Sequence, residues 1–374
     1  MTEPEIGIEN VKEMNAIRRQ WQKAGRPVLG PLFFLVVIVG LILELIPANY
    51  YVLMPGQAIN VQGMIAIKKY PVPAMRGALY MTDVSLYKVD HKLEQLVEHV
   101  YAWVNPGVEL VPGPEISGGM SDAQYTHTNV QLMGDSVQAA QVAALRNVGL
   151  LRLTCADRAV TIAQTLPQAP ASRVLRSGDI VRRLAGKPIC RAADFSRVMR
   201  RQTVGRPLRV SVLRGSRLVT LQVDTLRARR QGLSLIPSAT GHIAMVGIAM
   251  VDDVRAQRVH LPVPIRVDTN GIGGPSAGLM FTLAIVERLK HEDLTHGCKI
   301  AGTGTIDYDG NVGEIGGVEQ KIIAASRAGA RYFIVPNTPA NVLPARANAY
   351  SIKVVPVSTL EQALRFLSHL RPCA

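Results

Sequence analysis

The most apolar stretch of the chain lies near its beginning. Residues 28–46 read VLGPLFFLVVIVGLILELI and carry a single charge, Glu44. A helix of roughly 20 apolar residues crosses a bilayer core, and Lys and Arg flanks stay on the cytoplasmic side. The preceding residues 1–27 contain such basic positions. This pattern predicts a transmembrane signal anchor over residues 28–47 in the cell membrane, with a cytoplasmic tail at residues 1–27 and the bulk of the chain outside the cytoplasm. A cleaved signal peptide fits less well because the apolar run is long.

The pattern of apolar and polar residues changes after this stretch. Over residues 48–134, short β-rich runs alternate with Pro and Gly, which predicts a membrane-proximal, mainly β segment without evident chemistry. From Asp135 to Val148 apolar residues recur at helical spacing. Residues 135–228 then form a second unit, and residues 229–374 a third.

The second unit has the order of elements of a small sheet domain. Its most recognisable step is Gly178-Asp179-Ile180 before a strand, and the succession resembles a PDZ domain. That resemblance implies that an extended peptide adds to a sheet edge, with its carboxylate bound on backbone N–H groups. The groups implied belong to Gly149, Leu150 and Leu151. A generic β domain that serves only as a spacer is the alternative.

The positive charge of the chain is concentrated in this second unit. The formal net charge is +14, and residues 141–231 hold 19 Arg and Lys against 4 Asp. A basic surface can face nucleic acid, anionic lipid or acidic peptide, and a merely solvated surface fits equally well. Phe195 is the only aromatic residue in this range, so a base-stacking platform is disfavoured and no nucleic-acid partner is predicted.

Cofactor signatures are absent from the sequence. The four cysteines show no C-x-x-C and no metal-like spacing with His, so no metal site is predicted. A phosphate loop of the form G-x-x-x-x-G-K-[ST] does not occur, so no nucleotide cofactor is expected either.

The third unit contains a glycine-rich turn that leads into an apolar helix. Pro275 suits a first helical turn, and residues 279–286 are apolar nearly all round, which predicts a buried helix. Ser276 then lies at the helix start, where unpaired backbone N–H groups can hold a developing oxyanion. Gly274 lets a substrate backbone approach. An ordinary serine near a helix cap is the alternative.

A lysine on an apolar helical stripe supports a catalytic role for the serine in this turn. Over residues 318–328, Val318, Lys321, Ile322 and Ala325 fall on one side. Burial lowers the pKa of a lysine amine toward a range in which it accepts a proton, and a serine nucleophile needs such a base. A lysine whose amine reaches back to water is the alternative.

These two motifs together resemble the proteolytic domain of Lon proteases. Gly274-Pro275-Ser276-Ala277-Gly278 and Gly316-Gly317-x-x-x-Lys321 carry the likeness, which covers about the last third of the chain. It implies Ser276 as nucleophile, Lys321 as general base and Thr303 as the hydroxyl that positions the amine. Gly273 stands where an acidic residue is usual. That glycine is normal in the membrane-anchored, PDZ-containing branch without an ATPase, which the whole chain resembles.

The expectation is therefore an α+β, multidomain protein with one N-terminal transmembrane helix, a β-rich segment, a PDZ-like domain and a Lon-type α+β proteolytic domain. By resemblance it is an ATP-independent, membrane-anchored serine endopeptidase that works through an acyl-enzyme, with the PDZ module recognising or gating substrate. Its expected partners are polypeptides, possible further copies in a six-membered ring, and the lipid bilayer. Two alternatives stand beside it: a non-catalytic PDZ scaffold, and Ser/His/Asp catalysis using His260 and Asp268.

Overall fold

A mixed sheet joins the two ends of the chain in the computed structural model, which describes residues 30–71, 76–166, 169–231, 234–237, 240, 242–254 and 261–373. Its strand order is β19-β18-β15-β3-β1-β4. The strands are β1 (Pro47–Asn60), β3 (Ala78–His91), β4 (Glu109–Pro112), β15 (Lys299–Gly302), β18 (Tyr332–Pro336) and β19 (Lys353–Val357). Strand β15 pairs in parallel with both β3 and β18, whereas β1 runs antiparallel to β3 and β4. The segment expected to be a separate β unit thus supplies half of this sheet.

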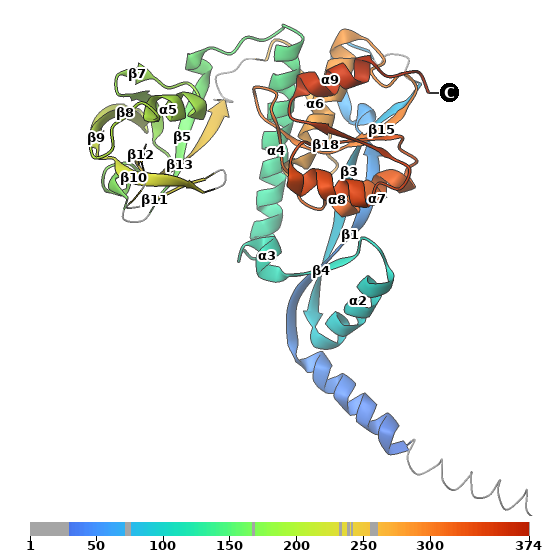
Figure 1. The fold of residues 1–374 in the computed structure, drawn as a ribbon. Coiled ribbons are helices and arrows are strands. Elements are labelled where there is room, and N and C mark those ends of the chain that lie inside the picture. The colour runs from blue at the N-terminus through green and yellow to red at the C-terminus, as the bar shows by residue number, and fades with distance from the viewer. Residues whose placement is uncertain are drawn as a thin grey trace, which may run out of the picture.

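Helices cover both faces of the sheet, and the alternation of side chains along the strands explains why (Figure 1). Ile300 and Ile334 pack with the helices α4 (Asp122–Asn147), α6 (Gly278–Lys290) and α9 (Leu360–Ser368). The intervening Ala301 and Phe333 pack with α7 (Val318–Arg327) and α8 (Pro339–Ala347). Successive side chains of a strand point to opposite faces, so each buried strand needs an apolar layer on either side. The result is a three-layer arrangement.

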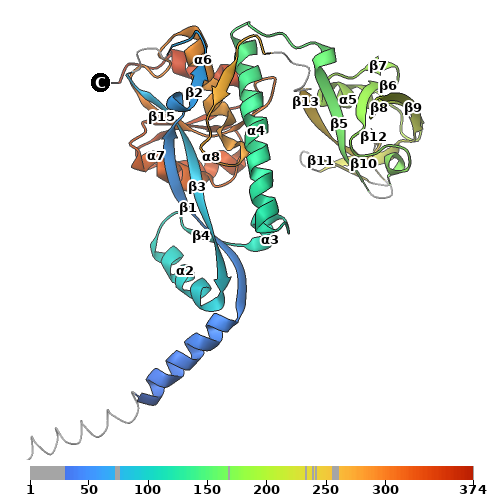
Figure 2. The ribbon, with the colours of Figure 1, turned by 180° about the vertical axis from the view of Figure 1, so that it is seen from behind.

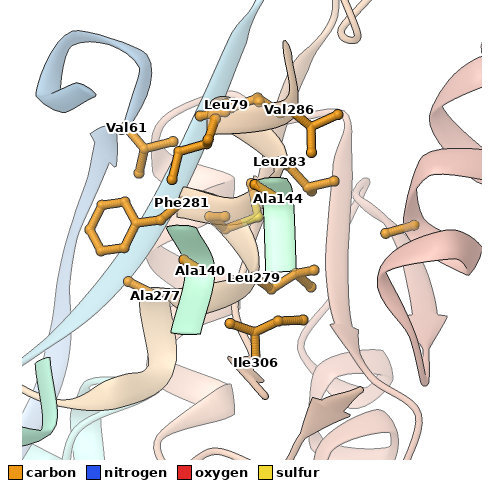
Figure 3. Close-up of a cluster of buried hydrophobic side chains, with 14 of the residues drawn as sticks. Val61, Leu79, Ala140, Ala144, Ala277, Leu279, Phe281, Leu283, Val286 and Ile306 are labelled. Carbon is orange, nitrogen blue, oxygen red and sulfur yellow. The ribbon is translucent and has the colours of Figure 1, made fainter. Parts of the chain in front are cut away.

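Helix α6 forms the centre of the larger core. All of its residues from Gly278 to Arg288 are buried, as the apolar run predicted. Figure 3 shows Leu279, Phe281 and Leu283 of this helix among side chains from α4 and from the strands. The structure begins α4 earlier than the expected helix at Asp135, because Ser121 and Gln124 form a capping box at its start.

The PDZ-like unit has its own core and lies beside α4 in both ribbon views (Figures 1 and 2). Its sheet has the order β13-β5-β6-β8-β9, and β7 pairs with β6. The strands are β5 (Arg158–Thr165), β6 (Ile180–Leu184), β7 (Lys187–Pro188), β8 (Leu208–Arg214), β9 (Arg217–Val223) and β13 (Ile248–Val254), with one helix, α5 (Ala192–Met199). A smaller sheet combines β10 (Leu226–Gln231), β11 (Ser234–Pro237) and β12 (Ile243–Met245).

The remaining elements are short, apart from α2. Two small antiparallel pairs join β2 (Ile65–Ile67) to β14 (Ile265–Val267), and β16 (Thr305–Ile306) to β17 (Val312–Gly313). The helices are α2 (Lys92–Val104) and α3 (Gly113–Ser117), and the 3₁₀ turns are η1 (Gln62–Met64), η2 (Cys155–Asp157), η3 (Pro170–Arg173) and η4 (Pro275–Ala277). Disulfides join Cys155 to Cys190 and Cys298 to Cys373.

The predicted transmembrane anchor is not supported. Among the described residues, no helix is both long and apolar enough to cross a membrane. The helix described in this region covers residues 30–45, and β1 begins at Pro47. The predictions of a transmembrane helix and of a single-pass location in the cell membrane were therefore wrong. The tail expected at residues 1–27 lies outside the described residues.

The packing of α6 yields a test of the core. Leu283→Ala removes a fully buried side chain and should lower the free energy of unfolding by about 3–5 kcal/mol, through lost burial and the cavity left behind. Leu343→Ala on α8 is the matched control, because that leucine is 65% exposed and its loss should cost less than about 0.5 kcal/mol. Urea denaturation of both variants provides the measurement, and equal losses would contradict the packing described.

Candidate active site

Ser276 lies in a turn whose backbone is hydrogen-bonded to helix α4. It is the central residue of η4, which precedes α6 directly, and Gly274 before it adopts a φ of 90° that favours glycine. The Gly274 N–H donates to the Asn129 carbonyl oxygen at 2.9 Å, and the Ser136 hydroxyl donates to the Pro275 carbonyl oxygen at 2.9 Å. Two residues of α4 thus fix the backbone on the N-terminal side of Ser276.

The backbone on the other side of Ser276 is fixed by the residues that follow β15. The Ser276 carbonyl oxygen accepts the Gly304 N–H at 2.8 Å and the Thr303 hydroxyl at 3.1 Å. Thr303 itself is 1% exposed, and its N–H donates to the Ile334 carbonyl oxygen at 2.9 Å. Because β15 is a buried central strand, Ser276 is positioned by one of the most constrained parts of the fold.

Lys321 approaches the serine from the opposite layer. Helix α7 begins after Gly317, and its Val318, Lys321, Ile322 and Ala325 are all buried, as the apolar stripe predicted. The Lys321 side chain is 4% exposed, and its Nζ donates to Ser276 Oγ at 2.8 Å and to Thr303 Oγ1 at 3.5 Å. The three residues that the sequence singled out are therefore brought together at the end of β15.

Burial gives the Lys321 amine the character of a base. Desolvation of the charged form lowers the pKa of Lys321 from 10.5 to about 8, and the negative charge of Asp83 on β3 partly opposes this shift. The neutral form thus becomes accessible near neutral pH. A neutral amine has a lone pair that can accept the proton of the adjacent Ser276 hydroxyl.

Three residues near this site were missed by sequence reasoning. Asp83 and Asn129 belong to residues 48–134, where no chemistry was expected, and Ser136 lies in the helix expected from Asp135. Only tertiary packing brings Asn129 and Ser136 to the serine turn, and the charge of Asp83 to Lys321. One signal was present: Gly273 replaces a usual acidic residue. A Cβ at position 273 would lie 3.0 Å from the Cβ of Asn129, so the glycine allows close contact with α4.

The amides of the expected carboxylate-binding loop donate hydrogen bonds to helix α4 instead. The N–H of Gly149 donates to the Arg146 carbonyl oxygen, and the N–H groups of Leu150 and Leu151 both donate to that of Leu145. These bonds close the C-terminal end of α4, as glycine-containing helix ends commonly do. In this conformation the three amides are already used and do not present an open cradle for a peptide carboxylate.

The two residues of the Ser/His/Asp alternative do not form a site in the described structure. His260 lies outside the described residues. Asp268 is exposed, and its carboxylate accepts the Asn270 N–H at 3.0 Å. Within the described part of the chain, no group of three or more His, Cys, Asp or Glu side chains is arranged to hold a metal ion.

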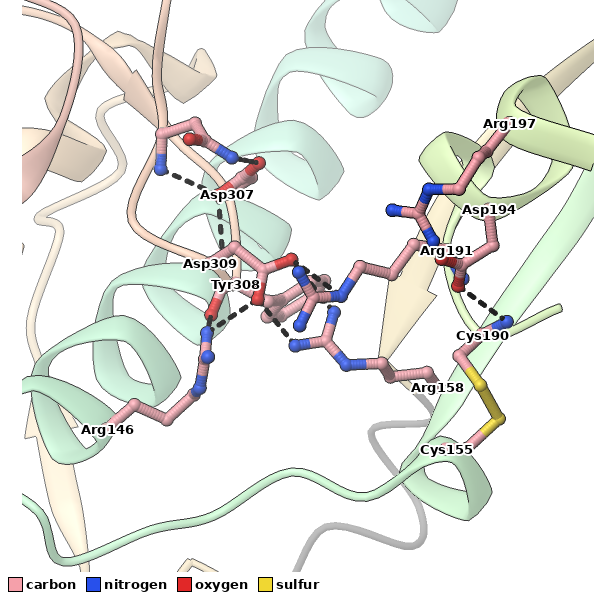
Figure 4. A network of polar contacts seen from close by, with 11 residues as sticks. Arg146, Cys155, Arg158, Cys190, Arg191, Asp194, Arg197, Asp307, Tyr308 and Asp309 are labelled. Atoms are coloured by element: carbon pink, nitrogen blue, oxygen red, sulfur yellow. Dashed lines mark hydrogen bonds and ion pairs between the residues drawn. A yellow bond between two sulfur atoms is a disulfide. The ribbon is translucent and has the colours of Figure 1, made fainter. Parts of the chain in front are cut away.

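An ion-pair cluster connects the PDZ-like unit to the catalytic core. Figure 4 shows three guanidinium groups around Asp309, which lies between β16 and β17: Arg146 of α4, Arg158 of β5 and Arg191 before α5. Burial raises the pKa of the Asp309 carboxyl, but the Arg158 hydrogen bonds and the three positive charges outweigh burial, so its pKa is lowered. Of these, Arg158 and Arg191 come from the PDZ-like unit, so one carboxylate holds that unit against the core.

Comparisons with known proteins find two domains in the chain. Residues 233–368 match the Lon protease (S16) C-terminal proteolytic domain, and residues 142–225 match the PDZ domain. Both domains are found in this chain. The Lon match contains Ser276, Thr303 and Lys321, whereas the strands β1 and β3 and most of α4 lie outside both matches.

Several curated relatives align with the Lon part. The chain is 31% identical to Lon protease 1 of Sorangium cellulosum over 146 residues, 38% of this chain and 17% of that protein. It is 31% identical to the archaeal Lon protease of Methanocaldococcus jannaschii over 157 residues, 37% of this chain and 23% of that one. The chain therefore aligns with less than a quarter of the length of either relative.

A solved structure aligns with the PDZ part. The PDZ domain of an SdrC-like protein from Listeria monocytogenes is 18% identical and covers 27% of this chain and 94% of its own. The TM-score of 0.22 is too low for this likeness to bear on the site.

The cluster around Asp309 leads to a prediction about pH and stability. Asp309→Asn removes the negative charge from three guanidiniums and should lower the free energy of unfolding at pH 7 by about 2 kcal/mol or more. A carboxyl whose pKa is lowered by folding stabilises above its unfolded pKa of about 3.9 and loses that effect as pH falls through its folded pKa.

The difference between wild type and Asp309→Asn should therefore shrink below about pH 4. Thermal unfolding across pH measures it. Asp224→Asn, at an exposed position in the PDZ-like unit, is the control and should show no such pH dependence. A difference that stays constant down to pH 3 would contradict the assigned role.

Proposed function

We propose that this chain is a serine endopeptidase that hydrolyses peptide bonds with Ser276 and Lys321 and does not consume ATP. The observation that carries the proposal is the 2.8 Å contact between Lys321 Nζ and Ser276 Oγ, with a buried amine whose pKa is lowered to about 8. A serine and a desolvated lysine in hydrogen-bond contact form a nucleophile and its base. The match of residues 233–368 to the Lon proteolytic domain supports this chemistry.

In the proposed reaction the neutral Lys321 amine takes the hydroxyl proton of Ser276 as Oγ attacks the carbonyl carbon of the scissile bond. The C–O bond forms, the carbonyl π electrons move onto oxygen, and the tetrahedral oxyanion results. The first N–H groups of η4, from Ser276 and Ala277, have no partner within the turn and are the candidate oxyanion donors. The C–N bond then breaks, and the ammonium of Lys321 returns its proton to the leaving amine.

Deacylation repeats the same transfers with water. Lys321 takes a proton from a water molecule as its oxygen attacks the acyl-enzyme carbonyl, and returns that proton to Ser276 Oγ when the ester bond breaks. Thr303 contributes by holding both partners, because its hydroxyl accepts from the Lys321 amine and donates to the Ser276 carbonyl oxygen. It is a positioning residue in this scheme.

The other parts of the proposal rest on the domains. A PDZ domain beside a proteolytic domain suggests polypeptide substrates, which the PDZ unit would recognise or gate. The sequence contains no phosphate loop, so hydrolysis should proceed equally with and without added ATP. Assembly into a six-membered ring rests on the resemblance to Lon domains alone, and the mass of the chain in solution tests it.

Substitutions of the pair test the chemistry. Ser276→Ala should lower the turnover of an unfolded protein substrate by at least about 10³-fold, and Lys321→Met should do the same while keeping the volume of the buried side chain. Lys299→Met, at an exposed lysine, is the matched control and should retain activity. A serine-directed fluorophosphonate should label the wild type and not Ser276→Ala. Failure to label or to cleave, in a folded chain, would favour the non-catalytic scaffold.

The lowered pKa of Lys321 predicts a pH dependence. The base is the neutral amine, so activity should rise with pH, by about tenfold between pH 7 and pH 9 around a midpoint near 8, and then level off. Asp83→Asn removes a charge that raises the pKa of this amine, so the midpoint should move to lower pH. Initial rates across pH provide the measurement. A flat profile, or a midpoint that moves upward in Asp83→Asn, would count against Lys321 as the base.

A further inference from the structure

One edge of the PDZ-like sheet is formed by a strand from outside the residues that match the PDZ domain. Strand β13 pairs antiparallel with β5, in a register that runs from Ile248 opposite Thr165 to Val254 opposite Arg158. The match to the PDZ domain ends at residue 225, so β13 lies outside that domain. It belongs instead to the range that matches the Lon proteolytic domain.

Strand β13 lies at a sheet edge, the kind of position at which a PDZ domain adds a peptide. PDZ domains bind an extended peptide as a further strand on a sheet edge. Without β13 the described sheet would end at β5, whose other neighbour is β6. Helix α5 also lies against β13, and Figures 1 and 2 both show β13 along the outer side of β5. The strand therefore occupies the β5 edge of this sheet, next to α5, and an external peptide could pair with β5 there only if β13 left.

The strand is held mainly by its backbone. Ile248 and Met250 are only partly buried against the core of the unit, and Ala249 and Val251 are exposed, Val251 by 54%. By contrast, Val160 and Ile162 of β5 are fully buried. The ladder is also interrupted by a register shift between Ala249 and Met250. Elements with little buried apolar surface open at low free-energy cost.

We propose that residues 248–254 are an internal ligand of the PDZ domain, which leaves the edge of β5 when an external peptide binds there. The peptide class follows from the strand it replaces: an extended segment with apolar side chains at alternate positions, as Ile248 and Met250 have. The net positive charge of residues 141–231 favours peptides that also carry acidic residues, as β13 does at Asp252 and Asp253. Peptide binding to the β5 edge does not require Ser276 to hydrolyse peptides, so this proposal is independent of the proposed function.

Displacement of β13 would change the surroundings of the turn that contains Ser276. Val251 lines a cavity of about 480 Å³ between the two units, together with Thr161 of β5 and with Pro275, the residue before Ser276. Removing the strand takes away part of the cavity wall on the PDZ side. Exchange of β13 for an external peptide would thus change one wall of a cavity that Pro275 also lines.

Peptide binding to the Ser276→Ala chain tests the proposal without cleavage. The probe is a fluorescein-labelled peptide of sequence IAMVDDV, measured by fluorescence anisotropy, and the control peptide has Ser in place of Ile and Met. The N–H groups of a strand point alternately to its two sides, so the double variant Met250→Pro and Val251→Pro must remove a donor from the β5 ladder. This variant should bind the probe at least about tenfold more tightly, because an occupied edge reduces apparent affinity by the fraction that is open.

A covalent lock gives an independent readout that does not require β13 to be disrupted. Gln164 and Ala249 are exposed register partners, so Gln164→Cys with Ala249→Cys should form a disulfide that keeps β13 in place. The locked chain should lose binding of the probe and regain it under reduction, with the wild type under the same reductant as control. Binding by the locked chain equal to wild type would overturn the proposal. So would a folded double-proline variant without increased affinity, and β13 would then be a permanent strand.

Discussion

The site depends on keeping water away from one amine. Lys321 can act as a base near neutral pH only because its ammonium form is poorly solvated, and the layers on both sides of the sheet provide that environment. Burying a lysine costs free energy, and the structure partly compensates with the Ser276 and Thr303 hydroxyls and with the charge of Asp83. The balance matters, because a stronger acidic partner would hold the proton on the amine. Burial thus lowers the pKa of Lys321, and the charge of Asp83 limits how far it falls.

The same constraint explains why the two ends of the chain share a sheet. The serine comes from the layer of α6 and the lysine from the layer of α7, and they meet where β15 ends and Thr303 begins the next segment. That meeting requires β15 to be central, with β18 on one side and β3 on the other. Since β3 and α4 are supplied by the first part of the chain, the matched proteolytic segment does not bury its own site alone. The early residues are part of the catalytic core.

Local patterns predicted the helices of the candidate site far better than they predicted the architecture. The apolar run at residues 279–286 and the stripe on α7 are periodic signals within one helix, and both were confirmed as buried helices. The pairing of β3 with β15 joins distant residues and leaves no local signature. The composition of residues 28–46 predicted a membrane span, whereas no helix among the described residues is long and apolar enough to cross a membrane. The cap at Ser121 was a readable signal that was overlooked, and with it the helix that carries Asn129 and Ser136.

The placement of the PDZ unit follows from how it is attached. The chain enters it at the end of α4, where the Gly149 to Leu151 amides are used to close the helix, and leaves it through β13 toward the serine turn. Both attachments therefore adjoin elements that hold Ser276. Asp309 adds a third connection, through three guanidiniums and from the hairpin that follows Thr303. A rigid spacer would need only one such contact. Three connections next to elements that contact the Ser276 turn give a change in the PDZ unit a physical route to that turn, and the backbone bonds of β13 are of a kind that a peptide strand can also make.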